Sequence, residues 1–251
     1  GVGKKNYETL LGDTWSFNGK EWSEIKTNDV GTRDHHQMVF ADHLDAFVMY
    51  GGENSSRKFD TATWILKEGK FTPMIINGPG PRFHFGMAYD PTRKKIVLFG
   101  GGLENRKVGN DLWEFDGKSW TKIDARETML PRLHHSMVYD HDLKLIVMHG
   151  GSVIKAVEKS VDPSGFRREF SDETWGWDGK QWTKLATDGP TSSLPALGYD
   201  QKRKAVVAFG GSGADNTMTS ALWELKDGQW RKISNSGTWK WVDQKYVPVD
   251  Q

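Results

Sequence analysis

The feature that most constrains this chain is a unit that occurs five times: a tryptophan, a glycine-containing turn and a second aromatic residue. The first tryptophans follow one another at steps of 49, 49, 62 and 48 residues. The turns carry pairs such as Asp-Gly and Asn-Gly, which tolerate the positive φ angles of tight β-hairpins. The five units are Trp15…Trp22, Trp64…Phe71, Trp113…Trp120, Trp175…Trp182 and Trp223…Trp230.

A pair of glycines follows an apolar run in four of the repeats, and it fixes where the repeats differ. From the second glycine to the next first tryptophan is 12 residues in three cases and 24 in the fourth. One insertion therefore lies near 152–170. Apolar runs such as 96–99 predict strands that are buried on both faces. The pairs are Gly51-Gly52, Gly100-Gly101, Gly150-Gly151 and Gly210-Gly211.

Each repeat predicts four short strands, and four strands repeated at this period indicate a β-propeller. No window has the sustained apolar spacing of a helical solenoid. We predict an all-β fold, a single propeller domain over 1–251 with five four-stranded blades. The predicted blade units are 1–26 plus 238–251, 33–75, 82–124, 132–186 and 192–234.

The glycine pair, the downstream tryptophan and an Arg-x-x-His-like first strand resemble the kelch family in its bacterial form. The resemblance covers nearly the whole chain, and four linked repeats make it specific. It implies a kelch-type β-propeller in which each repeat forms one blade.

The two ends leave two interpretations open. The chain begins where a third strand is expected, and 246–250 lies where first strands lie. In one interpretation 238–250 pairs beside the N-terminal strands and closes a five-bladed ring, which removes exposed strand edges. In the other, the chain is a fragment of a six- or seven-bladed propeller and part of a larger polypeptide. We favour ring closure.

Composition excludes several classes of function. The chain has no cysteine, so disulfides, thiol nucleophiles and Cys-based zinc sites are excluded, as is a copper enzyme of the galactose-oxidase kind, which shares the kelch fold. The net charge of +1 argues against nucleic-acid binding. No apolar run approaches the roughly 18 residues of a membrane span. We expect no cofactor, and we favour a secreted or cell-surface location.

The predicted binding surface is the face that carries the strand 2–3 loops and the links between blades, because function concentrates on such variable segments. The insertion 152–170 is the first candidate. Basic pairs recur in these loops and could form a positive crown that attracts an acidic protein segment or an acidic glycan. The candidate residues are Arg57, Lys58, Arg106, Lys107, Arg167 and Arg168, with Lys4 and Lys5 in the first repeat.

Three arginines recur with a histidine two residues later, at the start of the innermost strands: Arg33, Arg82 and Arg132. We expect the arginines near the central channel, either facing a ligand or paired with carbonyls and acids. The histidines His35, His84 and His134 could in principle meet at a zinc ion. The width of a channel should separate them, so we predict histidines packed between blades and no metal site.

Most tryptophans hold fixed blade positions and are expected to pack between blades. Trp177, Trp239 and Trp241 are interpreted as lying off the repeat, so they are candidates for ligand contact or ring closure.

The function predicted from these features is a module that binds a protein or a glycan, with no catalytic residues. No unrepeated carboxylate pair suggests a glycosidase, and Asp116-Gly117 does not match the Asp-box of sialidases. The alternative is a sugar-acid-processing enzyme (an epimerase, mutarotase or glycosidase-like protein) with a site at the channel mouth that uses Arg82 and Arg132.

Overall fold

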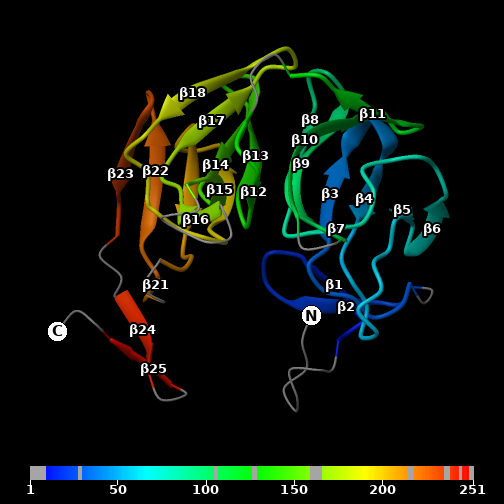
Figure 1. Ribbon diagram of the computed structural model, residues 1–251. Helices are drawn as coiled ribbons and strands as arrows, with labels where there is room; N and C mark the ends of the chain where they lie inside the picture. The colour runs from blue at the N-terminus through cyan, green and yellow to red at the C-terminus, as the bar shows by residue number, and fades with distance from the viewer. Residues whose placement is uncertain are drawn as a thin grey trace.

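The fold is given by a computed structural model that describes residues 10–27, 30–104, 107–125, 129–158, 166–213 and 217–234, and the backbone of 238–242 and 245–248. Within these residues the regular elements are antiparallel strands and one 3-10 turn, η1 (Asp42–Leu44). The sheets stand side by side around a common axis, each seen edge-on or obliquely in Figure 1. The predicted all-β architecture is confirmed.

Four sheets each contain a four-stranded blade in meander order with the first strand innermost; three of these sheets have no further strand, and that of the third blade has a fifth strand, β7 (Arg82–Phe83). The second blade has β3 (Gln37–Ala41), β4 (Ala46–Tyr50), β5 (Thr63–Lys67) and β6 (Lys70–Met74). The third has β8 (Gly86–Asp90), β9 (Lys95–Leu103), β10 (Val108–Phe115) and β11 (Trp120–Ile123). The fourth has β13 (Ser136–Asp140), β14 (Leu145–His149), β17 (Thr174–Trp177) and β18 (Trp182–Ala186). The fifth has β19 (Ala196–Asp200), β20 (Ala205–Phe209), β22 (Leu222–Lys226) and β23 (Gln229–Lys232).

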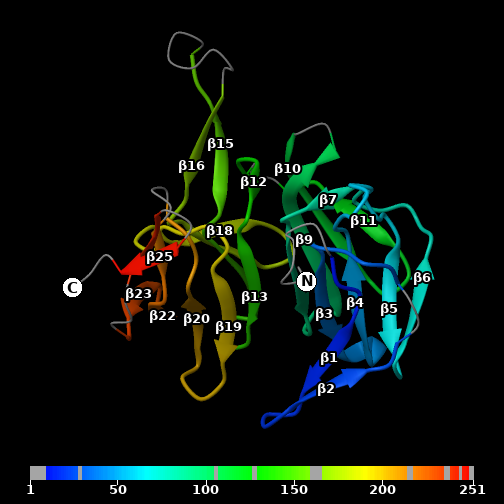
Figure 2. The same ribbon diagram turned by 90° about the horizontal axis from the view of Figure 1, so that it is seen from below.

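The first repeat contributes a two-stranded hairpin, β1 (Thr14–Phe17) and β2 (Trp22–Ile25). We predicted that 238–251 would pair beside this hairpin, and the described part does not. Instead β24 (Thr238–Val242) pairs with β21 (Thr217–Thr219) and with β25 (Lys245–Pro248). Only the β22–β23 hairpin separates β21 from β24 in the chain, whereas β1 and β2 lie near its other end, so the pairing with β21 has the lower loop-closure cost. Both views place β24 and β25 apart from β1 and β2 (Figures 1 and 2).

The insertion 152–170 forms a hairpin of its own. Strands β15 (Ser152–Ala156) and β16 (Phe166–Phe170) pair with each other, and β12 (Arg132–Leu133) adds to the edge of β15. In the third blade β7 (Arg82–Phe83) pairs in the same way with the far end of β9. Figure 2 shows the β15–β16 and β9–β10 hairpins on one side of the molecule, which we call the loop face. The β19–β20 turn lies on the opposite side, the turn face.

Aromatic residues fill the space between neighbouring blades. The indole of Trp120 in the third blade lies against Tyr50 of the second, with ring centroids 5.4 Å apart, and donates to Thr63 Oγ1 at 2.8 Å. Trp182 lies 5.4 Å from Phe99 of the third blade. Three apolar clusters join the second to the third blade, the third to the fourth and the fourth to the fifth. The predicted packing of the repeated tryptophans between blades is seen at these interfaces.

The glycine pair is required by a close approach of the chain to itself. Gly101 has a φ of 97°, and a Cβ on it would lie 2.7 Å from the Cβ of Phe85 and 2.8 Å from the carbonyl oxygen of Phe83. Any side chain at position 101 would be strained at this φ and would clash with the neighbouring backbone. The strand 2–3 loop therefore folds back tightly onto the start of the first strand, where the site described next is built.

Candidate functional site

The recurring arginines are structural anchors beneath the loop face. Arg82 is 1% exposed and donates to the Gly100 carbonyl at 2.9 Å and to both oxygens of Asp111 at 3.1 and 3.0 Å. The same carboxylate accepts the Trp113 indole N–H at 2.6 Å. Burial alone would raise the pKa of Asp111, but the hydrogen bonds from Arg82 and Trp113 hold it below its ordinary value. Arg82 and the half-buried Asp111 thus link β7, β9 and β10.

The same arrangement recurs in the neighbouring blades. Arg132 is 1% exposed, donates to Gly150 at 3.1 Å and lies 3.4 Å from Glu173, which accepts the Trp175 indole. Arg33 Nη2 lies 2.8 Å from Asp60, the acceptor for Trp64. Of the two roles left open for these arginines, the structure shows pairing with carbonyls and acids. Arg82 and Arg132 are too buried to reach a substrate as the enzyme alternative requires.

The histidines two residues further on form a row at the axis, contrary to the prediction that the channel separates them. The rings of His35 and His84 have centroids 3.9 Å apart, and those of His84 and His134 are 4.0 Å apart. Each of these residues has a positive φ, between 53° and 61°. The backbone N–H of His134 donates to the carbonyl of His84, and that of Leu194 donates to the carbonyl of His134. This kink turns each ring toward the axis, where the blades converge.

The row is partly open to solvent, and the imidazoles of His84 and His134 stay neutral near pH 7. Burial, with the neighbouring histidines and Arg168, lowers the pKa of His84 from 6.5 to about 3. Burial and Arg168 lower the pKa of His134 to about 4. Arg168 Nη2 lies 2.8 Å from His134 Nδ1. A guanidinium can only donate, so Nδ1 accepts and the ring proton of His134 is on Nε2.

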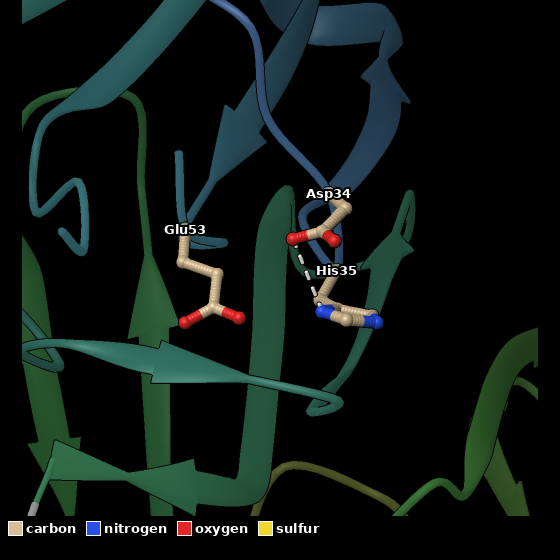
Figure 3. A group of neighbouring side chains, drawn as sticks. All are labelled: Asp34, His35 and Glu53. Carbon is tan, nitrogen blue, oxygen red and sulfur yellow. Dashed lines mark ion pairs between the residues drawn. The ribbon is translucent and has the colours of Figure 1, made fainter. Parts of the chain in front are cut away.

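Two carboxylates flank the first histidine of the row. His35 Nδ1 lies 3.1 Å from Asp34 Oδ1, and candidate ligand atoms of Asp34, His35 and Glu53 all lie within 4.8 Å of one another (Figure 3). Carboxylate and imidazole are common metal ligands. Here Glu53 is already paired with Arg57, and Asp34 with His35. Glu53 is thus accounted for without an ion, whereas Asp34 Oδ1 is buried and has no hydrogen-bond partner among the described residues. The absence of a metal site stays a prediction.

The basic residues predicted for the crown lie in the strand 2–3 segments of their blades, with Arg167 and Arg168 on β16. Arg57, Lys58, Lys107, Arg167 and Arg168 are all exposed, and Arg57 retains 78% of its side-chain surface. Arg167 lies 3.6 Å from Glu169, which Lys155 approaches to 2.6 Å. Of these residues Arg168 is the one that reaches the histidine row. Arg106, Lys4 and Lys5 lie outside the described residues.

Trp177 was interpreted as an off-repeat candidate for ligand contact, and its position does not suit that role. It is 0% exposed and donates to Glu114 at 3.0 Å. It pairs with Trp182 across β17 and β18, as Phe115 pairs with Trp120 across β10 and β11. The position is therefore part of the repeat and is structural. The side chains of Trp239 and Trp241 lie outside the described residues.

The contact between the histidines is the feature that sequence reasoning missed. Histidine is not among the main turn residues, although it is enriched at positive φ, so the local signal for this backbone conformation is weak. The signal was the exact recurrence of His two residues after Arg, together with a chain that must pass a glycine pair. These two facts together predict that the histidine rings crowd together at the axis. The prediction that the rings are separate came from the channel width that we assumed.

Comparison with known proteins gives a family match and a fold match. A family model described as the KLHDC2/KLHL20/DRC7 Kelch-repeats domain matches residues 2–196. Among solved structures 162 chains match, including one titled "Structure of YjhT". That structure has a TM-score of 0.70 and 14% identity, over 93% of this chain and 79% of its own. At such identity the likeness concerns the fold alone. None of the curated proteins compared with the chain matches it. Within the described residues no helix is long and apolar enough to cross a membrane.

Proposed function

The chain belongs to the kelch-repeat family, and we propose that it is a binding module whose loop face takes an acidic segment of a partner protein. The observation that carries the proposal is Arg168 held against the histidine row at the axis, with further basic side chains on the surrounding loops. Positive side chains around a recessed surface raise the local concentration of an anionic partner.

The histidine row suits such a partner because it is uncharged and still offers hydrogen bonds. His134 keeps its proton on Nε2, since Arg168 occupies Nδ1. A neutral imidazole N–H can donate to a carboxylate without the desolvation cost of burying a second cation. The histidine row therefore supplies a binding surface and hydrogen-bond donors for the partner, and the arginines and lysines around it supply the positive charge.

Binding of a fluorescein-labelled hexaglutamate peptide, followed by fluorescence anisotropy at several salt concentrations, tests the proposal. We expect Arg168→Ala to weaken binding by roughly five- to tenfold and to reduce the salt dependence. Arg57→Ala should have a smaller effect, because Glu53 already pairs with that side chain. Lys118→Ala is the matched control, an exposed cation in the Asp116–Ser119 turn on the opposite face.

Three results would contradict the proposal. Binding that does not weaken with added salt would exclude an electrostatic interface. Equal loss in Lys118→Ala and Arg168→Ala would show attraction to the whole molecule instead of to the loop face. A sulfated oligosaccharide that binds where hexaglutamate does not would replace the protein partner with a glycan.

A further inference from the structure

A pocket lies on the side of the molecule opposite the histidine row, where the innermost strands end at the turn face. Its volume is about 400 Å³. Each of the four inner strands β3, β8, β13 and β19 contributes the aromatic residue of the same position: Phe40, Tyr89, Tyr139 and Tyr199. We call it the aromatic pocket. The three tyrosines also pack in the apolar clusters that join neighbouring blades.

The tyrosine hydroxyls of this pocket are already engaged. Tyr89 donates to Asp42 and Tyr199 donates to Asp142, each across to the turn of the preceding blade. Tyr139 and Thr92 share a hydrogen bond of 2.5 Å in the same way. These contacts fix the rings and use up the groups that a sugar would need for its hydroxyls. His43 stacks on the ring of Tyr89, and His141 contacts the rings of Tyr139 and Tyr199. The surface that remains for a ligand is the exposed ring of Phe40 and the half-buried faces of Tyr89 and Tyr199.

Charge around the pocket favours a positive ligand. Asp42 is an acidic side chain in its lining, it is exposed, and no lysine or arginine belongs to the lining. The hydrogen bond from Tyr89 reaches Oδ1, and no hydrogen bond to Oδ2 is found among the described residues. A cation over aromatic faces gains from the ring quadrupoles, and a carboxylate at the edge adds Coulomb attraction.

We propose that the aromatic pocket binds a small organic cation with an alkylated ammonium group. The alkyl groups suit the mostly apolar lining of Met87, Met137 and Val138, and the charge suits Asp42 and the rings. The site differs from the loop face in position and in the sign of charge that it selects. It does not depend on the proposed acidic partner.

The test compares choline with 3,3-dimethyl-1-butanol, its uncharged counterpart of nearly the same shape, by saturation-transfer NMR and calorimetry on the full chain. We expect choline to bind about tenfold more tightly than the alcohol. Asp42→Asn should remove most of that difference. Asp45→Asn is the matched control, since Asp45 belongs to the same turn, is 80% exposed and faces Lys67. Arg168→Ala should leave choline binding unchanged.

Every other outcome overturns the proposal. Equal affinity for both probes would make the pocket merely apolar. Binding of methyl glucoside in preference to choline would make it a sugar site. If choline did not saturate the protein at millimolar concentration, choline would not be a ligand of the pocket. The wild-type comparison needs no variant, so a failure of Asp42→Asn to fold does not affect it.

Discussion

The tryptophan of the fourth strand is buried in the third, fourth and fifth repeats and exposed in the first. In the third, fourth and fifth blades the fourth-strand indoles of Trp120, Trp182 and Trp230 are 7%, 2% and 7% exposed. Trp22 occupies the equivalent place in β2 and is 65% exposed. The sequence unit is the same in all four. The difference teaches that the indole stabilises an interface and not its own hairpin, so its energy depends on the blade before it.

Removing a buried indole gives the largest expected effect. Trp182 packs against Phe99 and Trp177, so Trp182→Ala leaves a cavity between the third and fourth blades. We expect a loss of about 3–5 kcal/mol in the free energy of unfolding, measured by urea denaturation. Trp182→Phe is the control, because Phe71 holds this place in the second blade. If the two variants were equally destabilised, the cavity would not be the cause.

The fifth-blade interface adds a dependence on pH. His149 lies 4.7 Å from the Trp230 ring, and burial lowers its pKa from 6.5 to about 4. The unfolded chain therefore takes up a proton below pH 6.5 and the folded chain does not. Stability should fall as the pH drops from 6.5 toward 4, by up to about 3 kcal/mol from this residue.

The pH dependence can be isolated with His149→Phe. Phenylalanine is the natural residue at the equivalent positions 99 and 209. We expect the variant to have a shallower decline in melting temperature between pH 6.5 and 4 than the wild type. An unchanged slope would show that other groups, such as the buried His135, dominate the acid sensitivity.

The smallest effect is expected for Trp22, the exposed tryptophan in this comparison. Trp22→Ala removes an indole whose described ring contact is Phe17, at 5.1 Å. The free energy of unfolding should change by about 0.5 kcal/mol or less. A loss as large as that of Trp182→Ala would show that something covers Trp22 in solution, and the comparison would then fail.

The sequence was sufficient to predict the blades because each of their determinants is local. Apolar runs, Asp-Gly turns and the glycine pair specify β9, β10 and β11 without reference to other blades. The histidine row could not be predicted in this way, since its contacts join residues 49 and 50 positions apart through the curvature of the whole assembly. The pairing of β24 with β21 could not be predicted for the same reason. This pairing depends on which strand has an unpaired edge in the folded chain, and a sequence pattern does not show that.

Among the residues that the structure describes, the apolar clusters connect each blade only to its immediate neighbours. A molecule joined in this way behaves as a linear series of links, in which opening spreads from one link to the next and the middle links open last. The third and fourth blades have a packed neighbour on both sides, and they carry His84, His134 and Arg168. The surface proposed for the partner is thus held by the part of the chain that local fraying reaches last.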